Sequence, residues 1–220
     1  MIRLADVKKY YGSGDNIIRA VDDISLEVDA GEFLMITGPS GSGKTTLLNL
    51  IGGMTRPDTG EVEINKKDLL SMSDKELSRF RAASIGFAFQ FQSMLPYLSA
   101  IENIALPLMF THGGEEVNAK SLLKKVGLAD REDAYAHELS SGQQRRICIA
   151  RALVNRPMLL LCDEPTGDLD PETENVIMEV ISEANKEGAT IFMTTHNPGL
   201  RGYASRSLRI EAGIMVDEKN

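Results

Sequence analysis

One eight-residue stretch constrains the fold of this 220-residue chain more than any other: residues 38–45 read GPSGSGKT, which fits the pattern G-x-x-x-x-G-K-[ST]. The apolar run FLMIT at residues 33–37 comes directly before it, and a helical pattern starts at Lys44. A strand, a glycine-rich loop and a helix in this order form a phosphate-binding loop, or P-loop. Its backbone N–H groups and the positive end of the helix dipole attract the phosphates of a nucleoside triphosphate.

The side chains of the P-loop have distinct predicted roles. Lys44 places a point charge against the phosphates, and Thr45 offers its hydroxyl to Mg²⁺. We expect the following residues to bind the nucleotide: Gly38, Pro39, Ser40, Gly41, Ser42, Gly43, Lys44, Thr45 and Thr46. The motif indicates a nucleoside triphosphate without saying which one, or how its energy is used.

A second buried strand ends in two acidic residues. Residues 159–164 read LLLCDE, so Asp163 lies at the strand end and Glu164 follows it. Asp163 is placed to hold Mg²⁺, and Glu164, which points in a different direction, is placed to polarise a water molecule aimed at the γ-phosphate. Neighbouring carboxylates before Pro165 also fit an ordinary turn, but the P-loop in the same chain favours the catalytic interpretation.

Two hydrophobic patterns predict two kinds of strand. Apolar and polar residues alternate at 2–7, 24–28 and 61–64, which is typical of half-buried antiparallel strands. The runs at 33–37, 158–162 and 190–194 are almost entirely apolar, which is typical of a parallel sheet covered on both faces. Helical patterns lie between them at 44–51, 74–82, 119–126, 140–154 and 172–187.

These patterns predict an α/β fold with a mostly parallel P-loop core flanked by helices and an N-terminal antiparallel β subdomain. Residues 84–155 show no convincing buried strand after their first few positions, so a helical subdomain is predicted at about 87–155. The whole chain, 1–220, is expected to be one domain, with its core formed by about 1–86 and 156–220.

Composition excludes several classes of protein. With 42% hydrophobic and 25% charged residues, the chain is long enough to bury a sizeable core. The net charge of −8 and the lack of a large basic cluster argue against a nucleic-acid partner. No apolar run approaches the roughly 18 residues that span a bilayer, and no apolar leader follows Met1. We therefore expect a cytosolic protein whose membrane role, if any, depends on a partner.

The two cysteines carry no predicted chemistry. Cys148 falls in a helical pattern and Cys162 in a strand pattern, and no histidine or further cysteine stands at ligand spacing. We interpret both as small buried hydrophobic residues.

Residues 139–143 read LSSGQ and stand at the head of a helical run. Serine at a helix start is often only a cap for unpaired N–H groups. Here, however, LSSGQ is followed by Gln144 and Arg145 and precedes the LLLCDEP strand, which resembles the signature of ATP-binding cassette (ABC) ATPases. By that resemblance, Ser140, Ser141, Gly142 and Gln143 bind ATP.

Further motifs follow in the order of the ABC family. Gln90 in GFAFQ resembles the glutamine that reaches the metal and the catalytic centre, residues 167–170 (GDLD) resemble the D-loop, and His196 resembles the switch histidine. Tyr11 matches the V-x-K-x-Y pattern and is our candidate for stacking on adenine, with Tyr10 beside it as the alternative. The resemblance extends from residue 2 to about residue 213.

The resemblance implies an ATPase that works as a homodimer. Two ATP molecules would lie between the P-loop of one subunit and LSSGQ of the other, with Glu164, His196, Lys44 and Gln90 catalytic and Thr45, Gln90 and Asp163 holding Mg²⁺. The work of the dimer would drive an integral-membrane permease, which would place the chain on the cytoplasmic face of the cell membrane. The wording of several motifs, such as SAIENIALPL and CDEPTGDLD, resembles the branch that serves lipoprotein release and macrolide export.

Other interpretations stay open. The chain also fits an ATP-dependent regulatory dimer with slow hydrolysis, and more weakly a non-transport ABC ATPase acting on DNA or ribosomes. Residues 91–98 are unusually apolar for a loop and either pack inside the helical subdomain or line a groove for a permease helix. Ser141 stands where the family usually has glycine, which would matter if that position needed a positive φ or a close approach.

Overall fold

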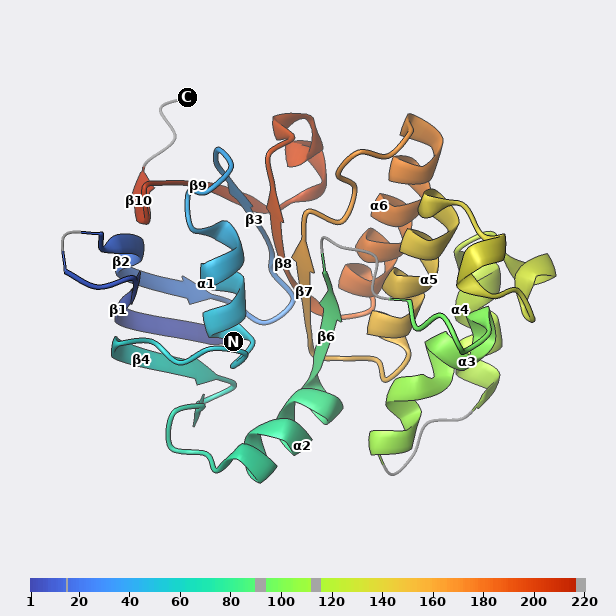
Figure 1. The fold of residues 1–220 in the computed structure, drawn as a ribbon, viewed down its shortest axis with the longest axis horizontal. Coiled ribbons are helices and arrows are strands. Elements are labelled where there is room, and N and C mark those ends of the chain that lie inside the picture. The colour runs from blue at the N-terminus through green and yellow to red at the C-terminus, as the bar shows by residue number, and fades with distance from the viewer. Residues whose placement is uncertain (15, 90–93, 112–115, 217–220) are drawn as a thin grey trace.

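The computed structural model describes residues 1–14, 16–89, 94–111 and 116–216. Its centre is a six-stranded sheet in the order β10-β9-β3-β8-β7-β6 (Figure 1). The strands are β3 (Phe33–Thr37), β6 (Ile85–Ala88), β7 (Leu159–Asp163), β8 (Thr190–Thr195), β9 (Arg206–Glu211) and β10 (Ile214–Val216). β6, β7, β8, β3 and β9 are parallel, and β10 pairs antiparallel with β9. The three predicted buried strands are confirmed, although β7 begins at Leu159, after the exposed Met158.

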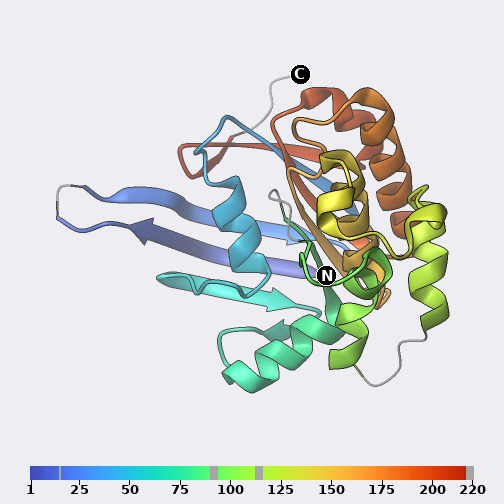
Figure 2. The same cartoon turned by 45° about the vertical axis from the view of Figure 1, so that its right-hand side comes forward.

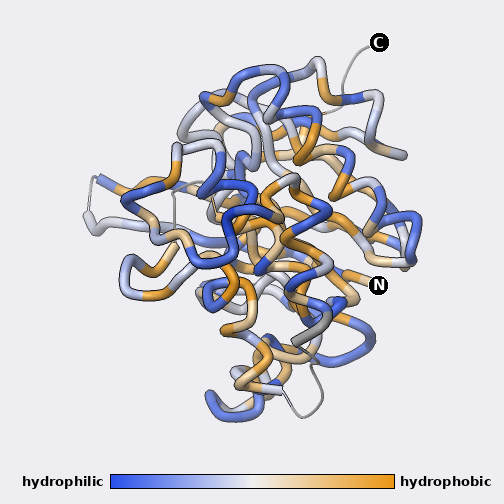
Figure 3. Tube along the Cα trace, turned by 90° about the vertical axis from the view of Figure 1, so that its right-hand side faces the viewer, coloured by the Kyte–Doolittle hydropathy of each residue, from blue (hydrophilic) through white to orange (hydrophobic). Residues whose placement is uncertain are grey.

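Strand alternation divides the core between the two faces of this sheet. Leu34, Ile36, Leu159, Leu161 and Phe192 face one cluster of buried side chains, whereas Phe33, Met35, Leu160, Cys162 and Met193 face the other. Because successive side chains of a strand point to opposite faces, an unbroken apolar run is what a doubly covered sheet requires. Figure 3 shows hydrophobic segments concentrated in the interior of the molecule.

A second, antiparallel sheet has the order β2-β1-β4-β5. It contains β1 (Ile2–Tyr11), β2 (Ile18–Val28), β4 (Thr59–Ile64) and β5 (Lys67–Asp68). The helix that follows β3 lies against this sheet, and the turn between β1 and β2 points away from the other helices (Figure 2). Lys9 pairs with Val21 and Tyr10 with Arg19, so Ala20 is an extra residue that makes a bulge in β2. The predicted N-terminal antiparallel sheet is confirmed, with β1 and β2 longer than predicted.

The helices cover both faces of the parallel sheet. They are α1 (Lys44–Ile51), α2 (Asp74–Ser84), α3 (Ala100–Ala105), α4 (Glu116–Lys125), α5 (Ser141–Leu153) and α6 (Pro171–Lys186). Short 3₁₀ helices are η1 (Leu106–Phe110), η2 (Ala129–Arg131), η3 (Ala136–Glu138) and η4 (Pro198–Tyr203). In Figure 1, α1 and α2 lie on one side of the central strands and α3–α6 on the other. Among the described residues, no helix has both the length and the apolar composition that crossing a bilayer requires.

Between β6 and β7, the described residues form helices joined by loops and no strand. Helix α5 packs against α3 and α4 within this segment, and also against α6 and β6 outside it. Buried side chains of α3, α4 and α5 therefore belong to the same core cluster as those of α6 and one face of the sheet. Cys148 and Cys162 are buried, as predicted, and burial raises the pKa of the Cys162 thiol.

Candidate nucleotide-binding and catalytic site

The P-loop connects β3 to α1 and lies against the bulge of β2. Gly43 occupies the N-cap position of α1 with a φ of 107°, in the left-handed region. A Cβ on Gly43 would lie 2.0 Å from the carbonyl oxygen of Ala20, so no side chain fits there. Having no side chain, Gly43 cannot cap the helix, which leaves the first N–H groups of α1 available to an anion.

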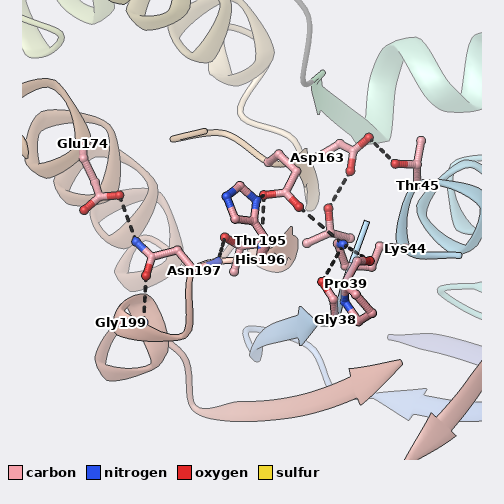
Figure 4. A network of polar contacts seen from close by, with 12 residues as sticks. Gly38, Pro39, Lys44, Thr45, Asp163, Glu174, Thr195, His196, Asn197 and Gly199 are labelled. Atoms are coloured by element: carbon pink, nitrogen blue, oxygen red, sulfur yellow. Dashed lines mark hydrogen bonds and ion pairs between the residues drawn. The ribbon is translucent and has the colours of Figure 1, made fainter. Parts of the chain in front are cut away.

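Lys44 keeps its ammonium group inside the loop. Its Nζ donates hydrogen bonds to the carbonyl oxygens of Gly38 (2.9 Å) and Pro39 (3.0 Å) and lies 3.5 Å from Oε1 of Glu164 (Figure 4). The Lys44 side chain is only 7% exposed. A buried ammonium group inside the loop is well placed to contact phosphate oxygens that enter it.

Asp163 is held by two hydroxyl groups from different elements. Thr45 donates to its Oδ2 (2.9 Å), and Thr194 donates to its Oδ1 (2.6 Å) (Figure 4). Asp163 ends β7 and pairs in register with Thr194 of β8, which explains the contact. The Thr45 hydroxyl and the Asp163 carboxylate are hard oxygen donors that lie side by side. Such a pair suits Mg²⁺, which usually takes one or two carboxylates and completes its shell with phosphates and water.

Glu164 turns away from Asp163 because its backbone is left-handed, with a φ of 47°. Strain of this kind at a non-glycine residue is often retained at functional sites. Its Oε2 accepts a hydrogen bond from the backbone N–H of His196 (3.1 Å) and lies 2.8 Å from Nδ1 of the same residue. The two adjacent carboxylates thus have separate surroundings, one beside Thr45 and the other beside Lys44 and His196.

Lys44, Thr45, Glu164 and His196 line one pocket with a volume of about 570 Å³, and Asp163 lies next to it through its hydrogen bond with Thr45. The pocket is lined by Tyr11, Ile18, Ala20, Ser40, Gly41, Ser42, Gly43, Lys44, Thr45, Thr46, Glu164 and His196. The hydroxyl oxygen of Ser42 is buried and has no hydrogen-bond partner among the described residues, which fits a loop built to receive a polar ligand. The pocket therefore brings together most of the residues that were predicted from the P-loop and from the two strand ends.

Tyr10 and Tyr11 have different surroundings. Tyr11 lines the pocket, whereas the Tyr10 hydroxyl donates to Oδ1 of Asp22 at 2.5 Å. This hydrogen bond raises the pKa of Tyr10 and engages its polar end away from the pocket. Geometry thus favours Tyr11 over Tyr10 as the residue that meets a nucleotide base.

The signature residues lie elsewhere. Ser140 is the N-cap of α5 and its hydroxyl accepts from the N–H of Gln143 (3.2 Å), while Oε1 of Gln143 accepts from the N–H of Ser140 (2.9 Å). This reciprocal pair is a capping box. Ser140, Ser141, Gly142 and Gln143 all belong to the described part of the chain, and none of them lines the pocket. Helices α1 and α5 lie on different sides of the central strands (Figure 1).

The predicted glutamine loop and D-loop remain to be placed. Gln90 lies outside the described residues. In the GDLD segment, Asp168 has a φ of 60°, and Asp170 caps α6 by accepting from the N–H of Thr173 (2.9 Å).

Sequence reasoning missed several residues of the site. Ile18 and Ala20 of β2 line the pocket, and Ala20 is the extra residue of a bulge for which the sequence carries no clear signal. Thr194 was predicted as part of a strand without a role, although a threonine at the end of an apolar run is a usable signal. Arg145 is buried, and its Nη1 donates to the carbonyl oxygen of Phe89 (2.8 Å), which joins α5 to the segment after β6.

The strand–P-loop–helix unit, together with a threonine and an aspartate aligned beside it, defines a P-loop nucleoside triphosphatase. A glutamate and a histidine in the same pocket complete a site with the groups that hydrolysis requires.

Comparison with known proteins gives the family. The ABC transporter family model matches residues 21–167. The chain is 42% identical to an uncharacterized ABC transporter ATP-binding protein, YknY of Bacillus subtilis, over 98% of this chain and 95% of that protein. It is 38% identical to the macrolide export ATP-binding/permease protein MacB of Chlorobaculum tepidum, over all of this chain but 34% of that protein.

A solved structure has the same fold throughout. It is the dimeric, post-hydrolysis state of the ATP-binding cassette MJ0796 of Methanocaldococcus jannaschii bound to ADP and Pi, with a TM-score of 0.94 and 37% identity, covering 100% of this chain and 98% of that one. The chain therefore belongs to the ABC transporter ATP-binding proteins. It is an ATP-binding subunit and an ATPase.

Proposed function

We propose that this chain hydrolyses Mg-ATP as a homodimer and thereby drives a membrane permease, of the export or mechanotransmission type, from the cytoplasmic face of the membrane. The observation that carries the proposal is that one chain supplies two halves of an ATP site on separate surfaces. The pocket is lined by P-loop residues and Glu164, and Asp163 is hydrogen-bonded to Thr45 of the same loop, whereas the capped start of α5 carries the signature.

Nucleotide binding is assigned to two surfaces. On the first, Tyr11 stacks on adenine while the P-loop residues Gly38, Pro39, Ser40, Gly41, Ser42, Gly43, Lys44, Thr45 and Thr46 bind the phosphates. On the second, the partner's signature positions corresponding to residues 140–143 face the γ-phosphate, because the N-terminus of α5 favours negative charge. Dimeric solved relatives support this arrangement.

The proposed chemistry is attack of water on the γ-phosphorus of ATP, which breaks the bond from that phosphorus to the β–γ bridging oxygen and releases ADP and phosphate. Glu164 orients the water and accepts its proton, Lys44 neutralises charge on the phosphates, and His196 contacts the γ-phosphate. Thr45, Asp163 and Gln90 would hold Mg²⁺, which when bound neutralises charge on the phosphate oxygens. The contact of His196 with Glu164 orients both groups within the same pocket.

A groove provides a candidate permease contact on the segment that leads to Gln90. It has a volume of about 360 Å³ and is lined by Met54, Arg81, Ala82, Ile85, Gly86, Phe87, Phe89, Pro107, Arg151, Ala152 and Asn155. The apolar floor and two arginines at this groove suit an amphipathic helix with acidic residues. Relatives that combine ATP-binding and permease functions in one protein support a permease partner for this chain.

The domain proposal follows the same division. We assign residues 1–220 to one ABC ATPase domain, in which about 87–155 form the helical subdomain that carries the signature. The remaining residues, about 1–86 and 156–220, form the ATP-binding core.

A Glu164→Gln variant tests the catalytic assignment. The amide keeps the shape of the side chain but cannot accept a proton, so steady-state ATPase activity should fall by about 100-fold or more while nucleotide affinity is retained. Activity is measured by phosphate release, and affinity by titration with a fluorescent ATP analogue.

The matched control is Glu174→Gln. Glu174 lies on α6 and accepts from Nδ2 of Asn197 at 3.4 Å, so the same chemical change occurs nearby but outside the pocket (Figure 4). This control should keep wild-type activity. Wild-type turnover in Glu164→Gln would remove Glu164 from the mechanism and favour a regulatory dimer.

A further inference from the structure

The ring of Tyr11 has a cation on one face. Nζ of Lys9 lies 5.6 Å from the centroid of the Tyr11 ring. Lys9 and Tyr11 are two residues apart on β1, where side chains at i and i+2 lie on the same face. Tyr11 lines the nucleotide pocket and Lys9 is not among the lining residues. The ammonium group occupies one face of the ring, here called the far face, and the near face is the one opposite to it.

Asp58 holds this ammonium group in place. Its Oδ1 accepts from Nζ of Lys9 at 2.9 Å, and its Oδ2 accepts from the backbone N–H of Tyr10 at 2.7 Å. The N–H of Asp58 also donates to the carbonyl oxygen of Lys8 at 2.8 Å. Asp58 is thus fixed to β1 at three consecutive residues. The ion pair with Asp58 explains why the Lys9 side chain is only 16% exposed, although lysine side chains usually extend into water.

The charge on Asp58 is favoured by the same contacts. Hydrogen bonds from the Tyr10 N–H and from Lys9 lower the pKa of the Asp58 carboxyl group. The carboxylate is therefore ionised at neutral pH, and Asp58, Lys9 and the Tyr11 ring form a continuous chain of contacts that ends at the pocket.

We propose that Lys9, anchored by Asp58, is a positioning residue that holds the Tyr11 ring ready for the base of a purine nucleoside triphosphate. The inference rests on the proposed stacking of Tyr11 on adenine. A cation against the far face attracts the ring and fixes its plane. Less side-chain freedom is then lost when the base stacks on the near face. Because Lys9 does not line the pocket that holds Lys44 and Glu164, it should change the affinity for the base and leave the rate of hydrolysis unchanged.

A Lys9→Met variant keeps the aliphatic stem and removes the charge. We expect KM for ATP to rise about 3- to 10-fold, as the loss of one pre-positioned side chain predicts, with kcat within about twofold of wild type. Inhibition by inorganic tripolyphosphate, which occupies the P-loop but has no base, should be unchanged. The KM-against-kcat split and the tripolyphosphate constant separate a role at the base from general damage to the fold.

Three further variants sharpen the test. Lys9→Gln can still bond to Asp58 but carries no charge, so it should behave like Lys9→Met even if the methionine variant folds poorly. Lys9→Arg keeps the charge and should restore a KM near that of wild type. Lys8→Met is the matched control, because Lys8 pairs with Asp23 at 3.3 Å and does not line the pocket.

Tyr11→Ala separates this inference from the function on which it rests. In the Tyr11→Ala background, Lys9→Met should cause no further rise in KM, because the ring through which Lys9 acts is gone. If Tyr11→Ala raises KM but Lys9→Met and Lys9→Gln do not, the positioning role is wrong and base stacking stands. If Tyr11→Ala leaves KM unchanged, base stacking and the role of Lys9 are both wrong.

Discussion

Ser141 shows how a departure from a motif can be harmless to the backbone. It is the first residue of α5, it is exposed, and its φ is not in the left-handed region. The freedom of glycine is therefore unused at this position. At Gly142, by contrast, a Cβ would lie 3.1 Å from Oγ1 of Thr173 on α6. The second glycine of the family pattern is retained where α5 approaches α6 closely, and the first is replaced where space is open.

This difference predicts distinct effects of substitutions at neighbouring serines. Ser140→Ala should lower the free energy of unfolding by about 1 kcal/mol, because it removes the cap of α5. Ser141→Gly should change it by less than about 0.5 kcal/mol, as for other exposed positions. Urea unfolding of both variants measures the two values. An equal loss at the two positions would contradict the assignment of Ser140 as the cap.

Among the secondary-structure elements, α3 holds the loop before it through one side chain. Asn103 is fully buried, and its Oδ1 accepts from the N–H of Leu95 at 2.8 Å. Its Nδ2 lies within 3.1 Å of the carbonyl oxygens of Leu95, Leu98 and Ser99. Met94 is buried in the core, so the apolar loop packs inside the helical segment at that point.

The same loop presents apolar side chains to solvent. Leu95 is exposed, and Tyr97 is 91% exposed. The two interpretations of this stretch therefore apply to different residues: packing holds for Met94, and contact with a permease remains a proposal for Leu95 and Tyr97. Residues 91–93 lie outside the described part of the chain.

Asn103→Ala should destabilise the protein strongly. The change removes the hydrogen-bond partner of the Leu95 N–H and of the Leu98 carbonyl group, whereas the carbonyl groups of Leu95 and Ser99 keep backbone hydrogen bonds. Two unsatisfied buried groups predict a loss of about 2–4 kcal/mol in the free energy of unfolding. Asn185→Ala is the control, since Nδ2 of Asn185 donates to Gly31 O and Ala189 O nearer the surface, and about 1 kcal/mol is expected. Thermal and urea unfolding would measure both, and similar losses would contradict the special role of Asn103.

The helices and strands that were predicted from the sequence are those with a strong hydrophobic pattern, either a continuous apolar run or a helical repeat. β3, β7 and β8 are nearly continuous apolar runs, and α6 has one buried face whose residues recur every three or four positions over sixteen residues. β9 was missed because charged residues interrupt it and only Ile210 is fully buried. α3 was missed because its six residues are too few to show a helical repeat.

The site was predictable to a similar degree and for a similar reason. Lys44, Thr45, Asp163 and Glu164 stand at fixed offsets from strand ends, so their convergence follows from the topology. The contacts of Asp58 with Lys9 and Tyr10 could not be predicted, because they depend on how β1 meets the loop before β4 and on hydrogen bonds between residues 48 or more positions apart.

For the whole molecule, the separation of the pocket from the signature predicts ATP-dependent association. Glu164→Gln should form a dimer in the presence of Mg²⁺ and ATP and remain monomeric with ADP, because only ATP retains the γ-phosphate that both subunits would contact. Size-exclusion chromatography with light scattering measures the mass. Omission of Mg²⁺ with a chelator should weaken the dimer, since phosphate charge is then less neutralised.

A charge at the signature provides the matching test. Adding Ser141→Glu to Glu164→Gln places a carboxylate where the partner's γ-phosphate would lie, and it should abolish the dimer by repulsion without unfolding the exposed helix start. Ser121→Glu, at an exposed position on α4, is the control and should leave the dimer intact. Dimerisation that survives Ser141→Glu would show that the signature does not form the interface.

The close contact between Ala20 and Gly43 affects the free energy of nucleotide binding. Because the carbonyl of the β2 bulge fills the space beside Gly43, the sheet that carries Tyr11 and the loop that carries Lys44 form one continuous wall. The spacing between Tyr11, the proposed contact for the base, and the P-loop is therefore set when the protein folds. A nucleotide meets a site of fixed length, and none of its binding energy is needed to bring the two ends together.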